Sequence, residues 1–296
     1  MRPRTRRHWR WVVLGMAAVL AAAALTAWRS AIHHNRQVAF EPFPIAGNLY
    51  YVGTPDVTAF LLTGPQGHVL IDGGYPESAA GIMANIARLG FRITDVKVLL
   101  NTHAHEDHAG GLAALQKASG AQLWISRGDA RVVAAGGVGD PTLGPFRLLA
   151  YLGLTGYPAP RIDHRFDDGA TVRLGPIELT AHATPGHTPG CTSWSFPVRD
   201  GARRWLAVDV CSLTVLPFDY PGRQAGFERS FRTLRSLPAE LFLGSHASFF
   251  GMQRKLAQRA KATDPVAPFI DRAGYLRYVD RAEATFRRDV AKRGDR

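Results

Sequence analysis

The chain has 296 residues, of which 46% are apolar and 20% are charged. This length allows one large domain or two small ones, and the composition excludes a generally disordered or fibrous protein. The formal net charge of +12 is basic. However, the basic residues are scattered and lack interleaved aromatic residues, so we expect no nucleic-acid partner.

The first 27 residues predict an export signal or a membrane anchor. An apolar stretch from Trp11 to Ala27 follows five arginines with no acid among them: Arg2, Arg4, Arg6, Arg7 and Arg10. Small residues from Ala21 to Ala24, and again at Ala27, offer cleavage sites, but the stretch also reaches the lower length limit for an anchor. We expect an exported, periplasmic protein, which contacts the membrane only if the leader is uncleaved. Cleavage removes five arginines and lowers the formal charge from +12 to +7.

Short apolar strands and helical stretches make up the first half of the chain after the leader. Turn residues between Gly64 and Gly67 mark a hairpin, and Gly90 is a suitable helix cap. In chain order we expect strands Leu49–Val52, Val57–Thr63 and His68–Asp72, a helix Ser78–Leu89, a buried strand Val96–Leu100 and a helix from about Gly110 to Ser119.

The second half repeats this plan after a loop over Gly136–Pro160, in which Phe146–Leu152 could form a helical turn. Two halves of this kind predict an α+β protein in which helices cover two packed sheets. The expected elements are strands Thr171–Arg173, Ile177–Ala183, Thr192–Pro197 and Trp205–Val210, a helix Phe227–Leu237, a strand Glu240–Gly244, and helices Gly251–Lys261 and Ala273–Lys292.

Three histidines and an aspartate occur within six residues after the expected strand Val96–Leu100. In an extended segment His103, His105 and Asp107 alternate onto one side, and His108 would open the following helix. Imidazole and carboxylate groups are the usual nitrogen and oxygen ligands of zinc, and catalytic sites keep a position open for water. The density of ligand types therefore predicts a metal site at the end of this strand.

Two further histidines lie where side chains can reach the same edge of the sheets. His187 is in a tight loop between two strands, and His246 follows the expected strand Glu240–Gly244. The two cysteines, Cys191 and Cys211, lie in apolar strand-like runs. They could pair in an oxidising compartment, but we expect them to be unpaired and buried.

The sequence resembles the metallo-β-lactamase superfamily over roughly residues 45–265. The resemblance lies in the His-x-His-x-Asp-His cluster, in Leu70–Gly74 and in the Thr-Pro-Gly-His loop that ends at His187. It implies a four-layer αβ/βα sandwich of two mixed sheets with helices outside, forming one domain over residues 38–296. Four stretches resemble the third subclass of class B β-lactamases: Asn101–Gly111, Thr180–Trp194, Cys211–Val215 and Gly244–His246.

The resemblance also implies a set of zinc ligands. His103, His105 and His187 would hold the first of two zinc ions, and Asp107, His108 and His246 would hold the second. Asp72 would orient a ligand histidine. The family pattern places a serine at Ser212, but a shift of up to three residues would make Asp209 a bridging ligand, as in glyoxalase II-like enzymes. We prefer Ser212 because strand alternation and the following Leu-Thr-Val match it better.

The activity implied is hydrolysis of a β-lactam amide, and hence antibiotic resistance. A hydroxide activated by two zinc ions and oriented by Asp107 would attack the lactam carbonyl. Ser212 and Thr214 would hold the carboxylate of this small-molecule substrate, and we expect a monomer. Another hydrolase of the same fold, acting on a lactone or a thioester, is the nearest alternative. A noncatalytic zinc-binding protein is an alternative from another class.

Overall fold

The computed structural model describes residues 38–294 except 154, together with residues 9, 13, 15, 16 and 19. Contacts divide the chain into two units, Met1–Val38 and Ala39–Arg296. Apart from those five isolated positions, the predicted leader lies outside the described residues. No helix within the described part of the chain is long and apolar enough to cross a membrane.

The first sheet of the second unit has seven strands, which lie side by side in sequence order. The first four strands pair antiparallel and the last four pair parallel, so the sheet is mixed. Its strands are β1 (Phe43–Ala46), β2 (Leu49–Tyr51), β3 (Phe60–Gly64), β4 (Gly67–Ile71), β5 (Val96–Leu100), β6 (Gln122–Ser126) and β7 (His164–Phe166).

The second sheet has five strands in the order β12-β11-β10-β9-β8. Its pairs are antiparallel except for β11 and β12, which run parallel. Its strands are β8 (Thr171–Leu174), β9 (Ile177–Ala183), β10 (Thr192–Asp200), β11 (Arg203–Val210) and β12 (Leu241–Gly244). The parallel pair brings the carboxyl ends of β11 and β12 to one edge, where His246 follows β12.

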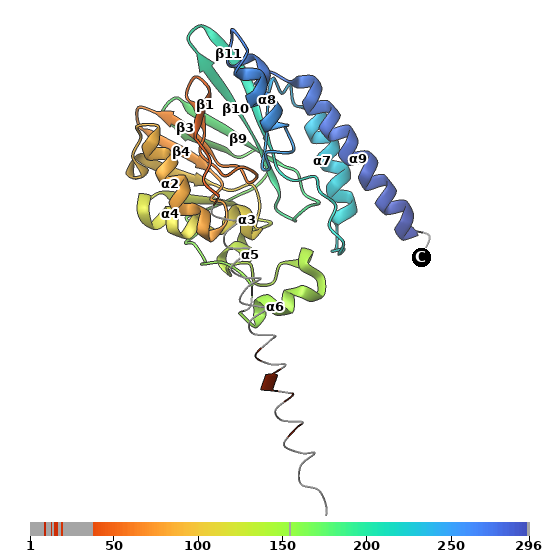
Figure 1. Ribbon diagram of the computed structural model, residues 1–296. Helices are drawn as coiled ribbons and strands as arrows, with labels where there is room; N and C mark the ends of the chain where they lie inside the picture. Colours follow the sequence, from red (N-terminus) through yellow and green to blue (C-terminus); the bar gives the residue numbers. More distant parts are fainter. Residues whose placement is uncertain are drawn as a thin grey trace, which may run out of the picture. The chain divides into compact units, whose positions relative to one another are not determined.

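The helices cover the outer faces of the two sheets (Figure 1). α2 and α4 pack on the first sheet through a cluster that includes Ile82, Leu112 and Leu115. α7 and α9 pack on the second sheet through residues such as Phe231 and Tyr275. The helices are α2 (Ala79–Arg88), α3 (Glu106–Ala109), α4 (Leu112–Ser119), α5 (Ala130–Ala134), α6 (Arg147–Tyr151), α7 (Arg223–Ser236), α8 (Met252–Arg259) and α9 (Arg272–Gly294).

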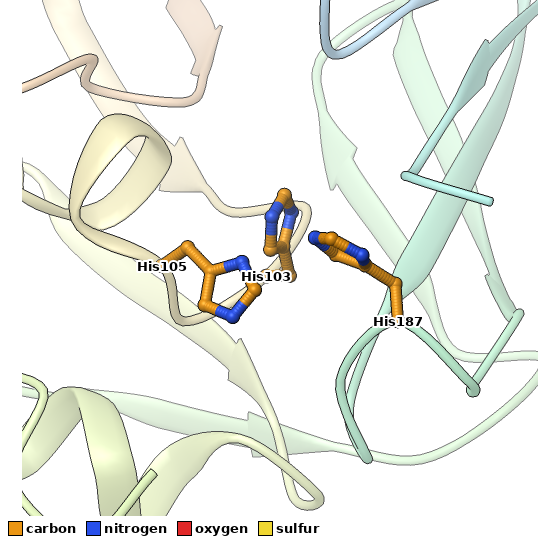
Figure 2. Close-up of side chains that lie close together, drawn as sticks. All are labelled: His103, His105 and His187. Atoms are coloured by element: carbon orange, nitrogen blue, oxygen red, sulfur yellow. The ribbon is translucent and has the colours of Figure 1, made fainter. Parts of the chain in front are cut away.

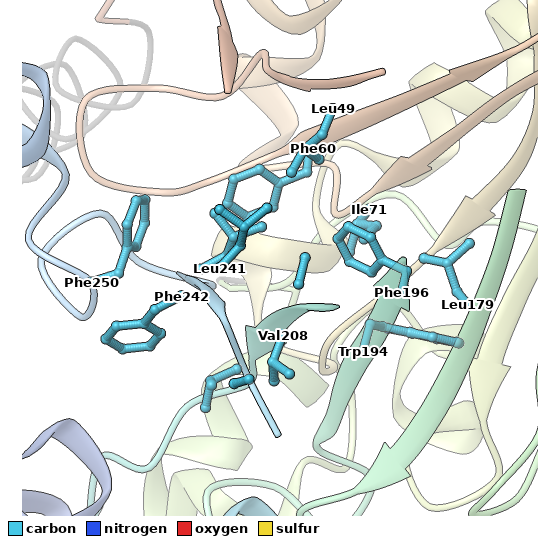
Figure 3. Packing of buried hydrophobic residues seen from close by; sticks show 14 of the residues in the cluster. Leu49, Phe60, Ile71, Leu179, Trp194, Phe196, Val208, Leu241, Phe242 and Phe250 are labelled. Atoms are coloured by element: carbon cyan, nitrogen blue, oxygen red, sulfur yellow. The ribbon is translucent and has the colours of Figure 1, made fainter. Parts of the chain in front are cut away.

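The main core fills the space between the two sheets (Figure 3). Phe60 and Ile71 reach it from the first sheet, and Trp194, Phe196 and Val208 reach it from the second. Each large apolar side chain buried in this way stabilises the fold by about 1.5 to 3 kcal/mol before entropy is counted. The predicted α+β sandwich, with helices outside two mixed sheets, is therefore confirmed.

Candidate metal centre

The predicted ligands lie on loops that follow strands of both sheets. The segment after β5 carries His103 and His105, the β9–β10 loop carries His187, and His246 follows β12. The helix expected from about Gly110 to Ser119 is present as α4, but His108 does not open it, because it lies inside a separate short helix, α3, which begins at Glu106. His105 is the extended residue before this helix, so Asp107 lies in its first turn rather than in an extended segment.

Three histidines form the first cluster, which Figure 2 shows. The ring centroids of His103 lie 4.8 Å from His105 and 4.9 Å from His187, and those of His105 and His187 are 4.7 Å apart. One ligand atom from each of the three lies within 4.8 Å of the others. The buried Nε2 of His103 has no hydrogen-bond partner among the described residues, so its lone pair is available to bind a cation.

The other ring nitrogen of each of these histidines is held by a polar group. His103 Nδ1 lies 3.1 Å from Thr102 Oγ1, and His187 Nδ1 lies 2.8 Å from the Thr214 carbonyl oxygen. His105 Nε2 lies 2.9 Å from Thr142 Oγ1. Outer partners of this kind fix the ring orientation and the tautomer of a metal-binding histidine.

Asp107, His108 and His246 form a second cluster beside the first. Asp107 Oδ2 lies 3.2 Å from His108 Nε2 and 3.4 Å from His246 Nε2, and the two imidazole nitrogens are 3.2 Å apart. Three potential ligand atoms therefore meet at one point, and His103 is also close to Asp107 and His108. The structure thus brings together all six residues that the sequence singled out as ligands.

Asp72 orients His108, as the resemblance implies. Its Oδ2 lies 3.0 Å from His108 Nδ1, and its Oδ1 accepts hydrogen bonds from the Thr102 amide and the Asn101 side chain. Asp72 has a φ of 63°, and Asn101 and Thr102 hold it in this left-handed conformation beside the cluster. A non-glycine residue in this region is uncommon, and such residues gather at functional sites.

The electrostatics of the two clusters differ. Burial and the neighbouring histidines lower the pKa of His103, and the same causes lower the pKa of His187 to about 3. Burial alone would lower the pKa of His108, but Asp107 and Asp72 raise it to about 10. His103 and His187 of the first cluster are therefore neutral, as metal-binding imidazoles must be. In the second cluster the carboxylate of Asp107 attracts positive charge, and a metal ion bound there would displace the proton that His108 holds in the metal-free protein.

Ser212, Thr214 and Asp209 lie on or after β11. Ser212 is buried and its Oγ accepts a hydrogen bond from the Thr214 amide, whereas Thr214 is exposed. Asp209 belongs to neither cluster. It is fully buried on β11, and its carboxyl group has no hydrogen-bond partner in the described part of the chain. Burial and nearby Asp72 raise its pKa well above the usual value.

Replacing Asp209 by Asn is expected to stabilise the metal-free protein increasingly as the pH rises. Because its pKa is raised in the folded state, Asp209 releases its proton on unfolding. The wild type therefore loses stability as the pH rises above the unfolded value of about 3.9, and an amide avoids this loss. Urea unfolding of wild type and Asp209→Asn at pH 5 and pH 8 measures the difference in unfolding free energy. An equal gain in stability at both pH values would contradict a raised pKa of Asp209 in the folded state.

The cysteines are paired, so the expectation of two unpaired thiols is wrong. Cys191 and Cys211 form a disulfide at a sequence separation of 20. Local apolar patterning could not reveal this, because the pairing depends on how the β9–β10 loop approaches the end of β11. The Cys211 sulfur lies 3.6 Å from His103 Nδ1, so the disulfide supports the first cluster from behind and supplies no thiolate ligand.

A cavity of about 470 Å³ opens beside the first cluster, and its lining includes His105 of that cluster and the neighbouring Glu106. One wall comes from the described residues of the segment 140–157, among them Leu143, Phe146 and Leu149. The opposite wall is formed by Leu216, Pro217 and Phe218. The rings of Phe146 and Phe218 meet across it at 5.7 Å, and Arg293 of α9 donates hydrogen bonds to the Leu216 and Pro217 carbonyl groups.

The sequence reasoning missed two polar residues of this segment. Asp140 and Thr142 are buried against His105, in a stretch expected to be a loop of no clear period. Asp140 caps a short 3₁₀ helix, η3 (Pro141–Phe146), and its Oδ1 accepts a hydrogen bond from the Thr142 amide. The Asp140-Pro141 pair was the available signal, since an acidic cap followed by proline is typical of a helix start.

Comparisons with known proteins agree with this fold and site. The family model of the metallo-beta-lactamase superfamily matches residues 52–202. A hydroxyacylglutathione hydrolase from Jannaschia sp. is 30% identical over 210 residues, which cover 71% of this chain and 69% of that protein. The chain spans 54% to 69% of the length of this and two other curated relatives, from Burkholderia pseudomallei and Cereibacter sphaeroides.

Solved structures match over a larger share of the chain. Native FEZ-1 metallo-beta-lactamase from Legionella gormanii is 34% identical, with a TM-score of 0.80, covering 86% of this chain and 97% of that one. BJP-1, a subclass B3 metallo-beta-lactamase of Bradyrhizobium japonicum, is 34% identical with a TM-score of 0.78, covering 88% and 97%. The chain therefore belongs to the metallo-β-lactamase superfamily of hydrolases.

Proposed function

We propose that the protein is an exported zinc β-lactamase, which opens the amide bond of the β-lactam ring. One observation carries the proposal: the two clusters lie in a chain that covers 97% of FEZ-1 and of BJP-1. The hydroxyacylglutathione hydrolase from Jannaschia is covered to only 69%. Asp209 stands apart from the clusters, which also favours the β-lactamase pattern at Ser212 over a bridging aspartate.

The residues of the two clusters fit two zinc ions. His103, His105 and His187 would provide three nitrogen ligands and leave a position open, as catalytic zinc sites do. Asp107, His108 and His246 would hold the second ion. When bound, the two ions would lower the pKa of a water between them and polarise a carbonyl oxygen.

The surrounding residues would then place the substrate. Asp107 has a side chain that is 22% exposed, so its carboxylate can orient the attacking water. The exposed Thr214 hydroxyl would bind the substrate carboxylate directly, and the buried Ser212 hydroxyl would act through water and through its hydrogen bond with the Thr214 amide. The apolar cavity would take the substituents of the lactam ring.

A thioester hydrolase is the second candidate, because curated relatives such as that from Jannaschia carry the name hydroxyacylglutathione hydrolase. Zinc-loaded protein is expected to hydrolyse nitrocefin, a chromogenic β-lactam, and to lose this activity with a chelator. S-Lactoylglutathione, a thioester, and an acyl-homoserine lactone serve as parallel substrates. Turnover of either of these, without turnover of nitrocefin, would refute the β-lactamase proposal. Zinc binding without turnover of any of the three substrates would favour the noncatalytic alternative.

Export is part of the proposal. It is supported by the arginine-rich apolar leader and by the disulfide between Cys191 and Cys211, since disulfides persist in oxidising compartments such as the periplasm. The mass of the protein recovered from a periplasmic fraction tests both the compartment and the cleavage of the leader. Recovery only from the cytoplasm would contradict it.

A further inference from the structure

We propose that Asp140 and Thr142 are positioning residues, which hold the ring of His105 in its metal-binding orientation and tie the apolar wall of the cavity to the metal centre. The inference rests on the metal sites of the proposed function but not on the choice of substrate. Both residues lie on the segment 140–157, outside the six proposed ligands.

His105 is turned differently from the other two histidines of the first cluster. The Nδ1 atoms of His103 and His187 face Thr102 Oγ1 and the Thr214 carbonyl oxygen, which leaves Nε2 for a metal. In His105 the engaged atom is Nε2, which lies 2.9 Å from Thr142 Oγ1 and 3.3 Å from Asp140 Oδ2. Only Nδ1 of His105 is therefore left to face the cluster.

The direction of the hydrogen bonds follows from the chemistry of the three groups. Thr142 Oγ1 lies 2.7 Å from Asp140 Oδ1, and a carboxylate can only accept, so the hydroxyl hydrogen points to Asp140. The Thr142 oxygen then faces His105 with a lone pair, which requires a proton on Nε2. Asp140 and Thr142 are 3% and 2% exposed, so water does not compete readily for these hydrogen bonds.

The same segment is tied to the cluster at both ends. Asp140 and Thr142 contact His105 near its start, and near its end the Tyr157 hydroxyl donates a 2.6 Å hydrogen bond to the Ala104 carbonyl oxygen. Between these two ties lie Phe146 and Leu149 of the apolar wall. A change in the orientation of His105 therefore also displaces the wall of the cavity.

The test measures the tautomer of His105 and the zinc affinity in Asp140→Ala, Thr142→Val and Thr142→Ser. In metal-free wild type, long-range ¹H–¹⁵N spectra should show the His105 proton on Nε2. In Asp140→Ala the Thr142 hydroxyl is free to donate to Nε2, so a mixture of tautomers is expected. Chelator competition should show a loss of affinity of about 10- to 100-fold at one of two zinc sites. Thr142→Ser should retain wild-type affinity.

Thr285→Val is the control, because it removes an exposed hydrogen bond on α9, from the Thr285 hydroxyl to the Arg281 carbonyl oxygen, far along the chain from both clusters. Thermal unfolding of the metal-free proteins separates loss of fold from loss of orientation. Thr142→Val keeps the test decisive if Asp140→Ala does not fold. A folded variant with wild-type affinity at both sites and the proton still on Nε2 would overturn the inference. Failure of wild-type protein to hydrolyse nitrocefin would count only against the proposed substrate.

Discussion

Replacing Asp107 by Ala is expected to lower the bound zinc from about two ions per chain to about one, and to reduce nitrocefin hydrolysis at least about 100-fold. Asp107 supplies the only carboxylate of the second cluster, and its Oδ2 lies within 3.4 Å of both His108 Nε2 and His246 Nε2. Without this negative charge two imidazoles alone would hold the second ion. Zinc content after dialysis and steady-state kinetics measure the two effects.

Asp167→Ala is a matched control, because Asp167 forms an exposed ion pair with Arg127 and such pairs contribute little. It should retain both zinc ions and full activity. His246→Ala is expected to lose one zinc ion and most activity, as Asp107→Ala is, since both residues belong to the second cluster. If Asp107→Ala kept two tightly bound ions, the assignment of the second site would be wrong.

Replacing Asp129 by Ala is expected to destabilise the protein by at least about 3 kcal/mol, because three buried donors lose their acceptor. Asp129 Oδ2 accepts hydrogen bonds from the Ala104 amide and the Thr188 hydroxyl, and Oδ1 accepts from the Gly190 amide. This 1% exposed side chain thereby joins the His103–His105 segment to the His187 loop. Urea unfolding at pH 7 measures the loss, and zinc affinity at the first cluster should fall with it.

Asp163→Ala provides the comparison for Asp129. The Asp163 carboxylate also accepts a hydrogen bond from a backbone amide, that of Leu123. However, the Asp163 side chain is 18% exposed, so water can replace its carboxylate as the acceptor. We therefore expect a smaller loss, of about 1 kcal/mol, and unchanged zinc affinity. Equal losses of unfolding free energy in the two variants would show that Asp129 has no special role in joining the loops.

The sequence predicts a strand well where an apolar run is clearly bounded by polar or turn-forming residues. The apolar run Val96–Leu100 predicts β5 with both ends correct, because turn-forming and polar residues bound it. β6 and β7 were missed, since both are short and include polar residues such as Gln122 and His164. β3 begins at Phe60 rather than Val57, because Val57 instead forms an isolated bridge with His246.

The site, too, could be predicted only where its residues form a local pattern in the sequence. The histidines and Asp107 could be recognised because their residue types are rare and lie close together in sequence. Asp129, Asp140 and Tyr157 act on those residues from other segments, so their contacts depend on tertiary structure. The disulfide between Cys191 and Cys211 escaped prediction for the same reason.

The proposed ligands come from both sheets, and this affects when an exported chain could acquire zinc. If the chain is exported as proposed, residues 103–108 would leave the exporter long before His187, and His246 would follow only after β12 had been translocated. A nascent chain therefore offers partial, weakly binding ligand sets until β12 pairs with β11. Because metal affinity depends on the folded arrangement, tight zinc capture would be the last event of maturation and would lock both halves of the polypeptide together.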